Sequence, residues 1–137
     1  MGNCKTKEIC GKSYNCYFEL TMTVFSGKWK AIILYHIARE EVLRFSEIRK
    51  GMNGITERML AKQLRELEAD GVVSRHIYNQ IPPKVEYRLT DIGKKLIPIL
   101  NMMKDWGIEY EEFLGGREIF ASAEYEQPDN NIIVLQN

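Results

Sequence analysis

Three cysteines, Cys4, Cys10 and Cys16, are the side chains of this sequence with the clearest capacity for chemistry. They recur at six-residue intervals with no C-x-x-C motif, whereas zinc ligands usually come in closer Cys or His pairs. Free thiols are typical of a reducing compartment, and an odd number leaves at least one thiol unpaired within the chain. A thiol at a helix N-terminus has a lowered pKa, which favours the reactive thiolate. We therefore expect no metal site and consider Cys16, just before a predicted helix, either a reactive thiol or a small buried apolar residue.

The two histidines, His36 and His76, have no accompanying carboxylates in a catalytic pattern. The chain also lacks a glycine-rich phosphate loop, a Ser-His-Asp set and an H-E-x-x-H run. The sequence thus predicts structural or surface roles for both histidines, no cofactor and no enzymatic activity.

Basic side chains form the second candidate group. Lys and Arg (19) balance Asp and Glu (19) over the chain of 137 residues, but the two signs are unevenly distributed. Residues 26–95 have fourteen basic and nine acidic side chains, a net charge of +5, whereas residues 96–137 have a net charge of −6. A local basic patch attracts a polyanion whatever the net charge, so the middle of the chain is a candidate surface for an anionic partner.

One predicted helix, from about Thr56 to Asp70 with Gly71 as its stop, separates apolar from basic side chains. At 100° per residue the three leucines fall on one face, and three basic residues fall on the opposite face. The leucines are Leu60, Leu64 and Leu67, and the basic residues are Arg58, Lys62 and Arg65. A solvated surface helix is the alternative interpretation of the basic face.

The elements that would position this helix have the order of a winged helix-turn-helix, a mainly α fold with a small β-hairpin. We expect helices near 16–27 and 28–39, a brief strand at 43–45, a short helix capped by Ser46, a turn at 51–54, the basic helix, and strands at 72–78 and 84–90. Pro82 and Pro83 lie in the hairpin loop. The major groove of DNA accepts one α-helix, so the basic helix would enter it and the hairpin would form the wing.

A long final helix is expected to begin at Thr90, with a kink between Lys94 and Pro98, where the proline removes a helical hydrogen bond. Its apolar residues recur at alternating spacings of four and three, which is a heptad seam longer than a small core can cover. They are Ile92, Leu96, Ile99, Met103, Trp106, Tyr110 and Phe113. The pattern predicts that this helix takes part in dimerisation, with Ile99, Met103, Trp106 and Tyr110 in the interface.

The predicted division of the chain is a flexible lead at 1–15, one DNA-binding and dimerisation domain at 16–114, and an acidic tail at 115–137. The tail ends in Ile132-Ile133-Val134-Leu135, which could add a strand to a sheet edge or belong to a disordered segment. No apolar run approaches the roughly 20 residues of a bilayer span, and the first residues lack a signal-peptide core. We therefore expect a cytoplasmic protein with no membrane partner.

Several motifs occur together in one order over about residues 16–107. They are Gly27-Lys28-Trp29-Lys30, Arg44-Phe45-Ser46-Glu47-Ile48, Gly54-Ile55-Thr56 with Met59-Leu60, Leu64 to Gly71, and Val85 to Gly93. In these motifs the chain resembles the HxlR-type branch of MarR-like bacterial transcription regulators. The resemblance implies a homodimer held by the first and last helices, which adds Phe18 and Met22 of the first helix to the interface. Such a dimer binds an inverted-repeat operator, often as a repressor and sometimes as an activator. The resemblance also implies an oxidant- or electrophile-responsive cysteine at Cys16, although the family commonly has Pro where this chain has Tyr17.

The resulting hypothesis is a homodimeric regulator that binds double-stranded DNA at a palindromic operator. Thr56, Glu57, Arg58, Lys62 and Arg65 would belong to the recognition helix, and Lys84, Arg88 and Lys28 would meet the DNA from the wing and backbone side. Two alternatives stay open. One is a winged helix that binds an acidic protein partner. The other is a regulator without thiol chemistry, whose small-molecule pocket between the dimer helices is lined by Trp106, Tyr110 and Phe18.

Overall fold

The computed structural model describes residues 5–115, and the acidic tail lies outside the described residues except for Gly115. The description begins with a hairpin of β1 (Lys7–Ile9) and β2 (Lys12–Tyr14), which pair antiparallel. Cys10 (φ 48°) and Gly11 (φ 77°) form its two-residue tip, and two positive φ angles are typical of the tight type I′ turn. The prediction of a flexible lead at 1–15 did not include this hairpin, in whose strands only Tyr14 is buried.

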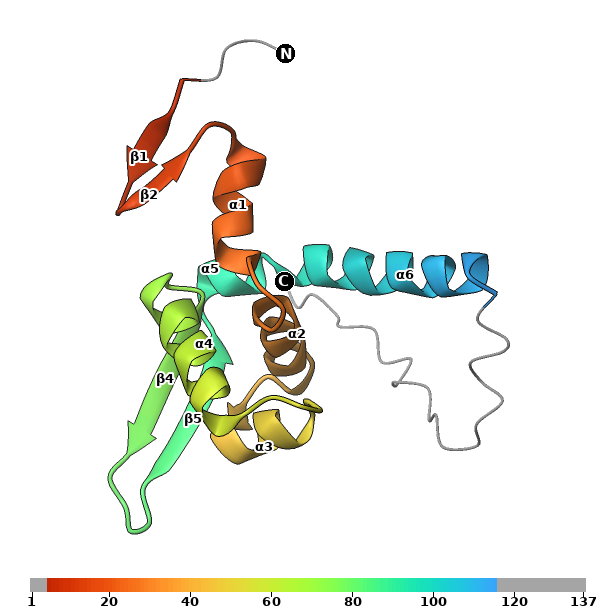
Figure 1. The fold of residues 1–137 in the computed structure, drawn as a ribbon. Coiled ribbons are helices and arrows are strands. Elements are labelled where there is room, and N and C mark those ends of the chain that lie inside the picture. Colours follow the sequence, from red (N-terminus) through yellow and green to blue (C-terminus); the bar gives the residue numbers. More distant parts are fainter. Residues whose placement is uncertain (1–4, 116–137) are drawn as a thin grey trace.

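Two helices follow the hairpin. Helix α1 (Tyr17–Phe25) begins directly after Cys16, and α2 (Lys30–Glu40) runs through the middle of the molecule (Figure 1). Helix α2 contributes Ile33, Leu34 and Ile37 to the core, and these three side chains are completely buried. Both helices lie close to their predicted positions, and Trp29 packs against the core.

The helix-turn-helix unit consists of α3 (Phe45–Lys50) and α4 (Glu57–Ala69). The prediction that Ser46 caps α3 is wrong, because Ser46 lies inside the helix. The N-cap is Arg44, two residues earlier, and the Glu47 carboxylate accepts a hydrogen bond of 3.0 Å from its backbone N–H. Ile48 of α3 and the leucines of α4 pack on α2 in one core.

The wing is a three-stranded antiparallel sheet rather than an isolated hairpin. Strands β4 (Val73–Tyr78) and β5 (Lys84–Leu89) pair along their whole length, and β3 (Leu43–Arg44) pairs with the other edge of β5. The order β3-β5-β4 places β5 in the centre. Lys84 and Arg88 therefore lie on the central strand, and β3 and β4 are the two edges.

The predicted long final helix is two helices. Thr90 caps only α5 (Asp91–Lys94), through a hydrogen bond of 3.1 Å from the Gly93 N–H, and α6 (Ile97–Phe113) begins after a break at Lys95 and Leu96. Pro98 lies in the first turn of α6, where its missing N–H costs no helical hydrogen bond. Only Ile97 and Leu100 of α6 are buried, and the helix projects from the body of the molecule (Figure 1).

Candidate nucleic-acid interface

Helix α4 is anchored along one face and capped at both ends. Leu60, Leu64 and Leu67 are buried in the core. The Thr56 hydroxyl accepts a hydrogen bond of 3.1 Å from the Met59 N–H, as expected of an N-cap, and Gly71 adopts the positive φ of 79° that ends the helix. These features fix which side of α4 is presented to solvent.

The solvent face of α4 carries the basic residues that the helical wheel predicts. Arg58, Lys62 and Arg65 are exposed, as are Thr56 and Glu57 at the start of the helix. Within the described part of the chain, the three cations form no hydrogen bond and no ion pair. Their charges are therefore available to an external anion.

The acidic residues at α4 do not cancel this charge, because each is held by a cation from a different element. Glu57 pairs with Arg49 of α3 at 2.7 Å, and Glu66 pairs with Lys30 of α2 at 2.8 Å. Glu68 pairs with Arg75 of β4 at 3.4 Å, and Asp70, the C-cap, pairs with Lys12 of β2 at 3.0 Å. The hydrogen bond from Lys30, followed by weaker contributions from nearby cations, lowers the pKa of Glu66, so this carboxylate stays ionised at neutral pH.

The two lysines beside Trp29 have different environments. Lys30 is buried and bound to Glu66. Lys28 is exposed, and its ammonium lies 4.5 Å from the centre of the Trp29 ring. Only Lys28 of the two remains available to a phosphate.

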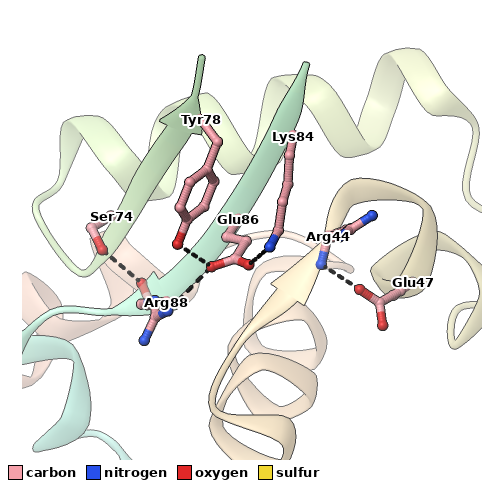
Figure 2. A network of polar contacts seen from close by, with 7 residues as sticks. All are labelled: Arg44, Glu47, Ser74, Tyr78, Lys84, Glu86 and Arg88. Atoms are coloured by element: carbon pink, nitrogen blue, oxygen red, sulfur yellow. Dashed lines mark hydrogen bonds and ion pairs between the residues drawn. The ribbon is translucent and has the colours of Figure 1, made fainter. Parts of the chain in front are cut away.

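The outer face of the wing is organised around one carboxylate, Glu86. Its oxygens accept from Lys84 at 3.0 Å, from the Tyr78 hydroxyl at 3.0 Å and from Arg88 at 3.1 Å (Figure 2). These contacts, with that of Lys84 largest, lower the pKa of Glu86 to about 2 against the opposing effect of burial. Lys84 and Arg88 are thus neighbours on the outer face as predicted, but their charges are partly neutralised by Glu86.

The tip of the wing, residues 79–83, carries no charged side chain, and Ile81 is fully exposed there. Among the described residues of the helix-turn-helix unit and the wing, the largest group of unpaired cations therefore lies on α4.

Comparison with known proteins agrees with this geometry. The family described as "HxlR-like helix-turn-helix" matches residues 24–113, which include α2 to α6. The chain belongs to the HxlR family. It is 49% identical over 109 residues to the HTH-type transcriptional regulator YdeP of Bacillus subtilis (strain 168), covering 80% of this chain and 84% of that protein.

Two solved structures of the redox regulator HypR are also similar to this HxlR-family chain. The oxidized form is 52% identical with a TM-score of 0.65 over 69% of this chain and 96% of that chain. The reduced form is 48% identical with a TM-score of 0.69 over 74% of this chain and 99% of that chain. The predicted fold class is confirmed, and the protein is a DNA-binding helix-turn-helix transcriptional regulator of a non-enzymatic family.

The HxlR-family match begins at residue 24, after Cys16. Cys16 is the N-cap residue of α1 and is exposed, with its backbone carbonyl accepting from the Leu20 N–H at 3.1 Å. Cys10, at the hairpin tip, is exposed as well, and Cys4 lies outside the described residues. In this protomer Cys16 is thus accessible to a reagent rather than buried in the core.

The six residues predicted for the dimer interface are all exposed. Phe18 and Met22 lie on α1, and Ile99, Met103, Trp106 and Tyr110 lie on α6. On α6 the rings of Trp106 and Tyr110 stack with centroids 4.8 Å apart, and Phe113 extends the stack at 6.0 Å from Tyr110. An exposed apolar surface of this extent marks an interaction site.

An apolar groove of about 270 Å³ lies between α2 and α6, lined by Ala31, Ile32, Tyr35, Leu100, Met103 and Lys104. It does not include Phe18, Trp106 or Tyr110, the residues predicted to line a small-molecule pocket.

Neither histidine belongs to a group that could hold a metal within the described residues. Burial, and secondarily Arg39, lowers the pKa of His36, and the His76 ring packs edge-on against Tyr78 at 4.6 Å. In the range 5–115 no helix has both the length and the apolar character needed to cross a bilayer.

Sequence reasoning missed the groups that hold the site in place. The role of Glu86 could have been predicted, because Lys84, Glu86 and Arg88 are spaced by two along one strand and therefore share a face. No local pattern indicates the ion pairs Lys30–Glu66 and Lys12–Asp70. Their members are 36 and 58 positions apart in the sequence, respectively.

Proposed function

We propose that the protein is a homodimeric transcriptional repressor that inserts α4 of each subunit into successive major grooves of an inverted-repeat operator, about 34 Å apart. The observation that carries the proposal is the charge distribution of α4. Three cations on its solvent face are unpaired within the described residues, whereas each acidic residue of the helix and its C-cap is paired to another element.

Phosphate contacts would supply most of the affinity, and Arg58, Lys62 and Arg65 are the residues assigned to them. Thr56 and Glu57 lie at the N-terminal end of α4, the part of a recognition helix that comes nearest the base edges. Lys28, Lys84 and Arg88 are assigned to secondary backbone contacts. Because Glu86 holds two of these three, their contribution should be smaller than that of α4.

Titration of duplex DNA from upstream of the protein's own gene, at several salt concentrations, tests this assignment. Arg58→Ala and Lys62→Ala should each weaken binding by about 1–3 kcal/mol and make the dependence of log affinity on log salt less steep. Lys95→Ala is the matched control, because it removes an exposed cation outside α4 and the wing. Wild-type affinity in both α4 variants would refute the assignment. Run-off transcription from the same DNA tests repression, which predicts less transcript as protein is added.

The dimer is proposed from the exposed apolar residues of α1 and α6. Their burial against a second copy would remove the aromatic stack of Trp106, Tyr110 and Phe113 from water. Trp106→Glu would place a charge in this interface and should yield a monomer in sedimentation equilibrium. Ile77→Glu, on the exposed edge strand β4, is the control and should remain dimeric. Monomeric wild-type protein at micromolar concentration would contradict the proposal.

Regulation through Cys16 is the third part of the proposal. It is supported by the exposure of Cys16 at the start of a helix assigned to the dimer interface, and by the similarity to a redox regulator. Diamide should change DNA affinity in the wild type and in Cys10→Ser but not in Cys16→Ser. A response that survives Cys16→Ser would instead favour an effector bound elsewhere, for which the groove between α2 and α6 is the candidate site.

A further inference from the structure

The N-terminal hairpin lies outside the residues that the family shares, yet one of its side chains reaches the recognition helix. The family match begins at residue 24, after both strands of the hairpin and most of α1. Figure 1 shows the hairpin beside α1. Lys12, in β2, is the residue that connects it to the DNA-binding unit.

The Lys12 ammonium makes two contacts on two different helices. It forms an ion pair of 3.0 Å with Asp70, the C-cap of α4, and donates a hydrogen bond of 2.9 Å to the Thr23 hydroxyl of α1. The Thr23 hydroxyl in turn donates to the Leu20 carbonyl at 2.6 Å, so its position on α1 is fixed. The Lys12 and Asp70 side chains are only 26% and 16% exposed, which reduces the screening of the pair by water.

The end of α4 has a second attachment at the base of the wing, where Thr90 follows β5. The Thr90 hydroxyl donates to the Gly71 carbonyl at 2.6 Å, and the Thr90 N–H donates to the Val72 carbonyl at 3.1 Å. The C-terminal end of α4 is therefore held at two points, the base of the wing and Lys12. A change in the position of α1 or the hairpin acts on α4 through the second of these points.

We infer that Lys12 is a positioning residue for DNA binding, which ties the end of the recognition helix to α1 and the hairpin and so transmits a displacement of α1 to α4. The inference rests on the proposed role of α4 in DNA binding and of α1 in the dimer. Cys10 and Cys16 flank this connection, one at the hairpin tip and one at the start of α1.

The test compares Lys12→Met, Asp70→Asn and the double variant with wild type in the salt-dependent DNA titration. Each single variant should lower affinity about three- to tenfold, and the double variant should be no weaker than either single variant. The salt slope should stay at the wild-type value, because no phosphate contact is lost. Lys12→Arg should restore most of the affinity, since it keeps the cation.

Two features separate positioning from a change in net charge. Removing a positive charge weakens DNA binding and removing a negative charge strengthens it, so a charge effect gives Lys12→Met and Asp70→Asn opposite signs. Positioning gives both the same sign. Lys7→Met is the matched control, because Lys7 is an exposed cation of the same hairpin. Among residues 5–115 its ammonium has one side-chain contact, with the Tyr17 ring at 5.1 Å.

Amide hydrogen exchange of the free protein supplies a readout independent of DNA. Lys12→Met should speed exchange at residues 66–72 and 20–25, and Lys7→Met should not. Three results would overturn this inference while leaving the proposed function intact. They are changes in DNA affinity of opposite sign in Lys12→Met and Asp70→Asn, a lowered salt slope in Lys12→Met, and wild-type affinity and hydrogen exchange in both variants. Wild-type protein that binds no duplex DNA would overturn the proposed function and the DNA role of Lys12 together. The hydrogen-exchange data would then still show whether Lys12 connects the end of α4 to α1 and the hairpin.

Discussion

The ion pair between Lys30 and Glu66 should respond very differently to removal of its two members. The Lys30 side chain is only 9% exposed, whereas the Glu66 side chain is 41% exposed, at an Nζ to Oε2 distance of 2.8 Å. Glu66→Met leaves a buried ammonium without its carboxylate. Lys30→Met replaces that ammonium by an apolar side chain of similar length and leaves a carboxylate that water can solvate. We therefore expect Glu66→Met to be the more destabilising of the two matched substitutions.

The magnitudes follow from the burial of each group. Removing one partner of a fully buried pair lowers the free energy of unfolding by about 3–5 kcal/mol. Because Glu66 is partly exposed, we expect a loss of about 2 kcal/mol for Glu66→Met. Lys30→Met should remain within about 1 kcal/mol of wild type, because no charge is left buried. The double variant should resemble Lys30→Met, since neither then contains a buried unpaired charge. In a chain of this size each kcal/mol corresponds to about 3–5 °C in Tm.

Urea denaturation of the four proteins at one fixed concentration measures these differences, because the concentration of a dimer affects its apparent stability. Lys30 lowers the pKa of Glu66, so the stabilisation is fully present above the ordinary carboxyl pKa and is lost as the pH falls through the lower folded value. The difference in the free energy of unfolding between wild type and Glu66→Met should accordingly become smaller at acidic pH. A larger loss of stability in Lys30→Met than in Glu66→Met would refute the reasoning.

Three further predictions concern the elements that hold α4 and the wing. Gly93→Ala should destabilise the protein by about 2–4 kcal/mol in urea denaturation, because the new Cβ would overlap the Val72 backbone carbonyl. In the control Gly107→Ala the new Cβ meets nothing within 4 Å, so this variant should be neutral or stabilised by up to about 1 kcal/mol. Equal changes in stability in the two variants would contradict this prediction. Thr56→Ala should cost about 1 kcal/mol through loss of the α4 N-cap, and Thr56→Ser should retain it; equal losses of Tm would show that the hydroxyl does not cap. Because the pKa of Glu86 is lowered from 4.5 to about 2, its stabilisation is present above about pH 4.5 and is lost between that pH and about 2. Glu86→Gln should therefore flatten the fall of Tm in this range, and an unchanged acid limb would show that Glu86 does not contribute to it.

The helix-turn-helix unit could be predicted from local patterns because its own sequence contains the necessary signals. The period of Leu60, Leu64 and Leu67 defines the buried face of α4, and Thr56 and Gly71 mark its ends. The basic residues opposite the leucines then follow by geometry. The order of the short helix, the turn, this helix and two strands was sufficient for the fold class.

The remaining features depend on helix caps, strand pairing and packing rather than on a hydrophobic period. The helix start at Phe45 depends on the Glu47 carboxylate, and the extra strand β3 exists through its pairing with β5. The break between α5 and α6 was expected as a kink at Pro98, but the helix restarts so that the proline falls in a first turn. The N-terminal hairpin has little apolar content, and a two-stranded sheet of this kind is stabilised by what it packs against. None of these contacts is encoded in a local period.

The charge of α4 shows why composition alone is a poor guide to its binding face. Residues 57–69 contain three acidic and three basic side chains, so the helix is formally neutral. Each acidic side chain is paired with a cation of α2, α3 or β4, and no basic side chain of the helix is paired within residues 5–115. The same ion pairs that orient the helix therefore also separate the signs of its charge. In the proposed recognition helix, one set of ion pairs therefore fixes both the orientation and the exposed charge, so a residue outside α4 such as Lys30 is expected to affect DNA binding.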